Sequence, residues 1–109
     1  MNFADNILAN LPSALTKEEC ETLAESKGGR IERIVSRGQV TQKNEWYDQD
    51  HDEWVMVVTG AASLQFEDNP TAQRLNAGDY LMIPAHCRHR VEWTDPGVET
   101  VWLAIHFSQ

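Results

Sequence analysis

The sequence lacks the motifs that mark several large protein classes. Its two cysteines, Cys20 and Cys87, form no CxxC pair, so a zinc ribbon has no support. It also contains no glycine-rich phosphate loop, no GxGxxG fingerprint and no GxSxG motif. The usual evidence for dinucleotide folds, phosphate-loop enzymes and serine hydrolases is therefore missing.

Basic clusters and long apolar runs are also absent. Lysine and arginine together number 9 against 17 acidic residues, which gives a formal net charge of -8. Such a charge repels a phosphate backbone, so we expect no nucleic-acid partner. The longest apolar run is far below the ~18 residues of a membrane span, and the N-terminal residues do not resemble a secretion signal. We therefore expect a cytoplasmic protein with no membrane partner, whose cysteines stay reduced.

One short segment near the N-terminus carries helix signals. Thr16-Lys17-Glu18-Glu19 matches a capping box, in which the first and last side chains each bond to the other's backbone amide. Cys20, Leu23 and Ala24 would form a narrow apolar stripe, and Gly28-Gly29 would stop the helix. These signals predict a helix over residues 17–27.

From Arg30 onward, the pattern is one of short strands and turns. Runs of β-branched and aromatic residues alternate with clusters of turn formers such as Asn76–Asp79 and Asp95–Gly97. This spacing predicts an all-β barrel or sandwich. We expect a single domain over residues 1–109, with an N-terminal arm and helix in 1–29 and a β-barrel in 30–109. The predicted strands are Arg30–Ser36, Trp54–Thr59, Ala62–Glu67, Tyr80–Ile83, His89–Trp93 and Thr100–Phe107.

Alternation along the strands directs titratable groups toward the interior. Between His89 and Trp93 the charged residues Arg90 and Glu92 share one face, so His89, Val91 and Trp93 should share the buried one. By the same period, Glu53 begins an inward-facing series. A buried histidine and a buried carboxylate both need polar partners.

Around Glu53 the chain resembles the first motif of the cupin superfamily. That motif is a glycine, five residues, His-x-His, three or four residues, Glu, six residues and Gly. Glu53 and Gly60 match it in identity and spacing, and Gly38 corresponds to the opening glycine after a longer gap. Tyr47 and Gln49 stand where the family has its histidine pair.

The second cupin motif is also recognisable. It reads Gly, five residues, Pro-x-Gly, two residues, His, three residues and Asn. Gly78, Pro84 and His89 keep its register, whereas His86 replaces the inner glycine and Trp93 replaces the asparagine. The resemblance covers Gly38 to Phe107 and implies a double-stranded β-helix, or jelly-roll, barrel.

The resemblance also implies a site inside the barrel. His89 and Glu53 match family metal ligands, Gln49 offers a neutral oxygen, and His51 lies close enough to replace a lost histidine. The implied cofactor is a divalent ion such as Zn, Mn, Fe or Ni. Tyr47 is a further candidate ligand, although its phenol is better suited to donating a hydrogen bond to a bound molecule.

Three functions remain open on the sequence alone. The chain could be a metal-dependent cupin, with or without catalysis on a small metabolite. It could instead be a metal-free module for a sugar or organic acid, with Tyr47, Trp93 and His86 among its ligand contacts. A metal-free isomerase using His89 and Tyr47 is the third. His106 aligns with no family ligand, and we expect a homodimer that pairs sheet edges.

Overall fold

Eight β-strands make up the regular structure of residues 3–12 and 16–108. The computed structural model describes residues 3–12 and 16–108. The strands are β1 (Glu19–Ser26), β2 (Gly29–Ser36), β3 (Glu53–Thr59), β4 (Ala61–Phe66), β5 (Asn69–Asn76), β6 (Tyr80–Ile83), β7 (His89–Thr94) and β8 (Thr100–Phe107).

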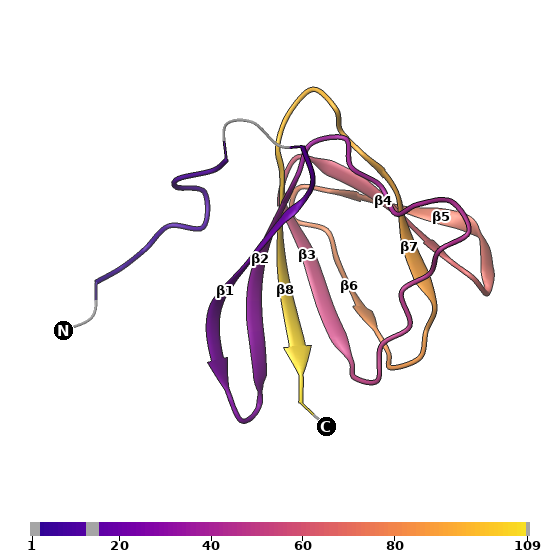
Figure 1. Ribbon diagram of the computed structural model, residues 1–109, viewed down its shortest axis with the longest axis horizontal. Helices are drawn as coiled ribbons and strands as arrows, with labels where there is room; N and C mark the ends of the chain where they lie inside the picture. The colour runs from indigo at the N-terminus through magenta and orange to yellow at the C-terminus, as the bar shows by residue number, and fades with distance from the viewer. Residues whose placement is uncertain (1–2, 13–15, 109) are drawn as a thin grey trace.

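The strands form two antiparallel sheets that enclose the interior. One has five strands in the order β1-β2-β8-β3-β6, and the other has three in the order β5-β4-β7. In Figure 1 the five-stranded sheet runs from β1 to β6, and β4, β5 and β7 lie to one side of it. This arrangement is the jelly-roll barrel expected from the sequence.

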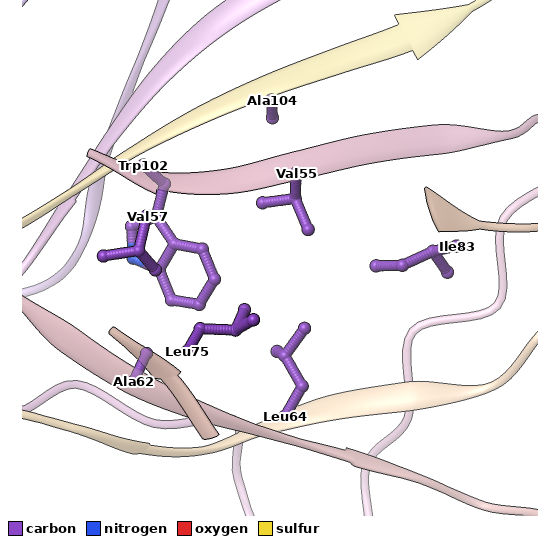
Figure 2. Packing of buried hydrophobic residues seen from close by; sticks show 8 residues of the cluster. All are labelled: Val55, Val57, Ala62, Leu64, Leu75, Ile83, Trp102 and Ala104. Carbon is purple, nitrogen blue, oxygen red and sulfur yellow. The ribbon is translucent and has the colours of Figure 1, made fainter. Parts of the chain in front are cut away.

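The hydrophobic core lies between the sheets because alternate residues of each strand point inward. Val55 and Val57 of β3 are 3% and 0% exposed, and Leu64 of β4 is 2% exposed. Figure 2 shows their side chains directed toward one another across the interior. The other members of this cluster are Ala62, Leu75, Ile83, Trp102 and Ala104.

The predicted helix over residues 17–27 is wrong, because this segment contains the strand β1. Glu19 and Glu21 alternate with Cys20 and Thr22, a period of two that suits a strand. A helix could bury only the narrow stripe, whereas β1 pairs along its length with β2. Gly29 is needed because a Cβ there would overlap the carbonyl oxygen of His106.

The strand β5 was also not predicted, since Asn69-Pro70 looks like a turn. Proline cannot donate a ladder hydrogen bond and is therefore confined to strand ends, bulges or edges. β5 is an edge strand of the three-stranded sheet, and Pro70 is its second residue. The remaining six strands agree with the predicted ones to within one residue at each end.

The N-terminal arm contacts the five-stranded sheet through β2. The Arg33 guanidinium donates hydrogen bonds to the carbonyl oxygens of Ile7, at 3.1 Å, and Ala9, at 2.7 Å. Within residues 3–12 and 16–108, no helix is long and apolar enough to cross a membrane.

Candidate functional site

A cavity of about 260 Å³ lies inside the barrel, between the two sheets. Its apolar walls include Val55, Leu64, Ile83 and Trp102, all of which belong to the hydrophobic core. Histidine, glutamate, glutamine and tyrosine side chains also line it. Apolar walls with a few polar groups are typical of small-molecule sites.

His89, the first residue of β7, is fixed from several sides. Its Nδ1 lies 2.9 Å from the carbonyl oxygen of Cys87. Because a carbonyl only accepts, Nδ1 carries the proton and Nε2 keeps its lone pair. The ring stacks on Tyr47 with centroids 5.5 Å apart, and Phe66 lies 6.0 Å away. His89 therefore lines the cavity as a buried hydrogen-bond acceptor.

Glu53, the first residue of β3, is 8% exposed and also lines the cavity. Its Oε1 accepts a hydrogen bond of 2.8 Å from the Gln49 side-chain amide. Its Oε2 lies 3.8 Å from Nε2 of His106, the residue opposite it on β8. These neighbours compensate for burial of the carboxylate.

Tyr47 is joined to His89 through the backbone. The amide of Tyr47 donates to the carbonyl of His89 at 2.7 Å, and the amide of His89 donates back at 3.1 Å. Partial burial raises the pKa of the Tyr47 phenol, as does the negative charge of Glu18. The phenol therefore keeps its proton and can donate a hydrogen bond, which disfavours a role as a phenolate metal ligand.

His106 and Glu32 are cavity residues that sequence reasoning missed. His106 Nε2 lies 2.8 Å from Oε1 of Glu32, and both side chains are mostly buried. Alternation along β8 places His106 on the same face as Trp102 and Ala104, so the sequence carried this signal. His106 was set aside in the sequence analysis because it aligns with no family ligand.

The cavity lining carries an excess of negative charge. Glu18, Glu32 and Glu53 line it together with the single guanidinium of Arg30, which lies 3.1 Å from Glu32. Burial raises the pKa of Glu18, and the charges of Glu32 and Glu53 act in the same direction.

The thiol of Cys20 lies beside these carboxylates, and their negative charges affect its pKa. Although part of its surface is exposed, partial burial raises the pKa of the Cys20 thiol to about 11, and the charges of Glu18, Glu32 and Glu53 contribute, while Arg30 opposes them. The thiol is therefore protonated at neutral pH. This part of the cavity wall favours neutral or cationic groups over anions.

Trp93 does not line the cavity with His89. In β7, Val91 pairs with Leu64 and Trp93 pairs with Ser63, so Glu92 is an extra residue that reverses the alternation. The Trp93 ring lies outside the barrel interior, with the Arg74 guanidinium 4.4 Å from its centroid.

Two other predicted site residues also lie away from the cavity. His86 is largely exposed, and its Nδ1 is 3.0 Å from Oδ1 of Asp48. Its φ of +63° is the left-handed conformation that the family's glycine would adopt there without strain. His51 contacts His106 from outside the cavity, with 2.9 Å between their ring nitrogens.

The donor set gives only partial support for a metal ion at His89. Among the described residues, no group of three or more His, Cys, Asp or Glu side chains could hold a metal. The hydrogen bond from His89 to the Cys87 carbonyl is compatible with a metal ligand, because it orients the imidazole and leaves Nε2 free to bind an ion. The cavity thus offers a metal ion one imidazole, that of His89, and one carboxylate, that of Glu53, whereas the side chains of Gln49 and Tyr47 are neutral.

The comparisons with known proteins agree on one fold. The family model described as the cupin domain matches residues 33–106. A candidate mannose-6-phosphate isomerase from Ralstonia eutropha JMP134 is 45% identical, with a TM-score of 0.95 over 99% of this chain and 100% of that one.

More distant structures share the fold. A cupin superfamily protein from Desulfitobacterium hafniense is 20% identical, with a TM-score of 0.73 over 91% of this chain and 84% of that one. A cupin-2 domain protein from Shewanella frigidimarina is 21% identical, with a TM-score of 0.65 over 83% and 80%. No curated protein matches the sequence. The two-sheet barrel, the motif residues and the family match together show that this chain belongs to the cupin domain family.

Proposed function

We propose that the barrel interior binds a small uncharged molecule with several hydroxyl groups, of the sugar or polyol class. One observation carries the proposal: hydrogen-bond acceptors dominate the polar part of the cavity lining. Glu32, Glu53 and His89 Nε2 can accept hydrogen bonds from hydroxyl groups, and the Tyr47 phenol can donate one. The apolar walls suit the C–H faces of such a molecule.

The same charge distribution argues against an organic acid as the ligand. Three glutamates line the cavity, and its one guanidinium, that of Arg30, is already paired with Glu32. An anion would lose its hydration and face negative charge. The name of the Ralstonia relative supports a sugar, but the cavity offers little to bind a phosphate group.

A thermal-shift series tests this function with defined probes. The series uses mannose, mannitol, mannose 6-phosphate and citrate on untagged protein. At a tenfold excess over Kd, binding stabilises the fold by about 1.4 kcal/mol. For a domain of this size, that raises Tm by roughly 6 to 11 °C. We expect mannose or mannitol to raise Tm and the two anions to leave it unchanged.

Matched variants locate the binding site. His89→Ala and Glu53→Gln should abolish the shift, whereas Trp93→Phe, which alters a residue outside the cavity, should keep it. Stabilisation by citrate alone, or a shift that persists in both cavity variants, would contradict the proposal.

A weakly held divalent ion at His89 is the second candidate function, favoured by the orientation of this imidazole. Because Nδ1 is hydrogen-bonded to the carbonyl oxygen of Cys87, Nε2 is free to bind a metal, and Glu53 and Gln49 line the same cavity. Metal analysis of untagged protein tests it. A content of Zn, Mn, Fe or Ni that disappears in His89→Ala would support this candidate, and equal content in the variant would refute it.

We also propose a homodimer that covers the β1 edge. β1 lies at one end of the five-stranded sheet, and all eight of its residues are exposed, including Leu23 at 45%. A long exposed edge strand invites pairing with another chain. Light scattering at micromolar concentration should give twice the mass of one chain, and a monomer mass would refute the proposal.

A further inference from the structure

Two histidines that match no ligand position of the cupin motifs meet at the end of the barrel. His51 lies in the segment before β3, and His106 is the seventh residue of β8. Nε2 of His51 and Nδ1 of His106 are 2.9 Å apart, and the rings meet edge to face at 62°. Residues 55 positions apart in the sequence thus bring two ring nitrogens into direct contact.

Each ring is oriented by a carboxylate on its other nitrogen. Nδ1 of His51 lies 3.0 Å from Oδ1 of Asp50, and Nε2 of His106 lies 2.8 Å from Oε1 of Glu32. Carboxylates only accept, so both outer nitrogens carry protons.

This pattern leaves two lone pairs facing each other. With each outer nitrogen protonated, a neutral imidazole has only a lone pair on its inner nitrogen. Two such lone pairs at 2.9 Å repel unless a positive centre lies between or beside them, either an added proton or a metal ion. Carboxylate–histidine pairs of this kind are the usual outer support of metal-ligating imidazoles.

The separation of the inner nitrogens fits a metal with cis ligands. With metal–nitrogen bonds of about 2.0–2.1 Å, nitrogens 2.9 Å apart subtend roughly 90° at the ion. That is the cis angle of octahedral and square-planar ions such as Ni²⁺ and Cu²⁺. Tetrahedral Zn²⁺ would need about 3.3 Å and hence a shift of the rings.

Space and charge beside the pair also suit a cation. A second cavity, of about 300 Å³, is lined by both histidines together with Glu25, Ser26 and Asp50. This cavity has room for water molecules at the coordination positions that the two imidazoles would not occupy. The Arg30 guanidinium, which also lines this cavity, lies 3.1 Å from Glu32.

We propose that His51 and His106 form a binding site for a late divalent transition metal, with Asp50 and Glu32 as the carboxylates that orient them. The site is distinct from the interior cavity and does not depend on the proposed sugar-binding function. His106 lines both cavities, but its metal-facing atom is Nδ1, whereas Nε2 is the atom near Glu53.

Calorimetric titration of untagged, EDTA-treated protein with NiCl₂ at pH 7.5 tests the site. We expect one Ni²⁺ per chain, a loss of affinity of more than tenfold in His51→Gln, and a loss of about tenfold in Asp50→Asn. Trp93→Phe, which alters a residue that lines neither cavity, should bind Ni²⁺ within twofold of the parent. His86→Gln is the control for an exposed histidine with its own carboxylate partner.

A spectroscopic readout separates a metal site from a proton-linked pair. Electron paramagnetic resonance of bound Cu²⁺ should show coupling to two imidazole nitrogens in the parent protein and to one in His51→Gln. Circular dichroism and Tm of the His51→Gln variant check that it folds. No Ni²⁺ binding up to 1 mM, or unchanged affinity in folded His51→Gln, would overturn the proposal and assign the pair to a shared proton. Sugar binding should survive His51→Gln, so failure of either proposal can be recognised separately.

Discussion

Replacing two motif glycines by alanine should have very different costs, although their backbones are nearly alike. Gly60 closes the first cupin motif with φ of +88°, and Gly78 opens the second with φ of +91°. An L-residue in a left-handed conformation costs about 1–2 kcal/mol, and both variants share this term. Any difference between them therefore reports what surrounds the added Cβ.

The surroundings of the two glycines differ sharply. A Cβ at Gly60 would lie 2.5 Å from Oγ1 and 2.6 Å from Cα of Thr100, a residue with no exposed surface, whereas a Cβ at Gly78 meets nothing within 4 Å. Thr100 Oγ1 also donates to the Ala61 carbonyl and accepts from the Ala61 amide. Overpacking adds about 1–3 kcal/mol, and each disrupted hydrogen bond adds about 1 kcal/mol.

We therefore expect Gly78→Ala to lower the free energy of unfolding by about 1–2 kcal/mol and Gly60→Ala by about 4–7 kcal/mol. Urea titration followed by tryptophan fluorescence measures both. Because total stability is about 5–15 kcal/mol, Gly60→Ala should be close to unfolded or only marginally folded. Equal losses in the two variants, or a loss below about 1 kcal/mol for Gly60→Ala, would refute the reasoning.

Three further variants test the charge and packing of the interior. Glu18→Gln should raise Tm at pH 7, because the raised pKa of Glu18 means that the folded protein disfavours its charged carboxylate. The gain in Tm should vanish below about pH 4, where Glu18 is protonated in both the folded and the unfolded protein. A gain that does not change with pH would contradict this reasoning. Cys20 should react with iodoacetamide at pH 8 about two orders of magnitude more slowly than a free thiol of ordinary pKa, and Glu32→Gln should increase the rate. A rate equal to that of free cysteine would contradict the influence of the neighbouring carboxylates on Cys20. Leu64→Ala should cost about 2–5 kcal/mol in urea unfolding because Leu64 is 2% exposed, whereas Leu8→Ala, at 47% exposure, should cost less than about 1 kcal/mol.

The barrel was predictable because its signals are local and repeated. Runs of β-branched and aromatic residues between turn formers identified six strands, and the two motifs fixed the family. The first strand was missed because the residues read as a capping box and a helix-ending glycine pair occur equally well at the start of a strand and in a hairpin turn. Pairing with β2 decided between them, and one sequence does not reveal pairing.

The site was predictable in part. His89, Glu53, Gln49 and Tyr47 all line the interior cavity, as the motif spacing indicated. Trp93 was misplaced because one extra residue in β7 reverses the alternation, and bulges leave no clear trace in sequence.

Contacts made across strands were not predictable. Arg30 and Glu32 lie on β2 and join the cavity because β2 pairs with β8, and Glu18, just before β1, joins it because β1 pairs with β2. The contact between His51, just before β3, and His106 of β8 likewise arises because β3 pairs with β8. Such contacts depend on register, which is a property of the folded sheets.

The most direct measurement of the central claim is a titration of isotopically labelled protein with mannose, followed by chemical shifts at each residue. Binding inside the barrel predicts saturable shifts at His89, Glu53, Gln49 and Leu64, which all line the interior cavity, with His86 unchanged. Shifts confined to His86 and other exposed residues, or none up to 50 mM mannose or mannitol, would contradict interior binding of a neutral polyhydroxylated molecule.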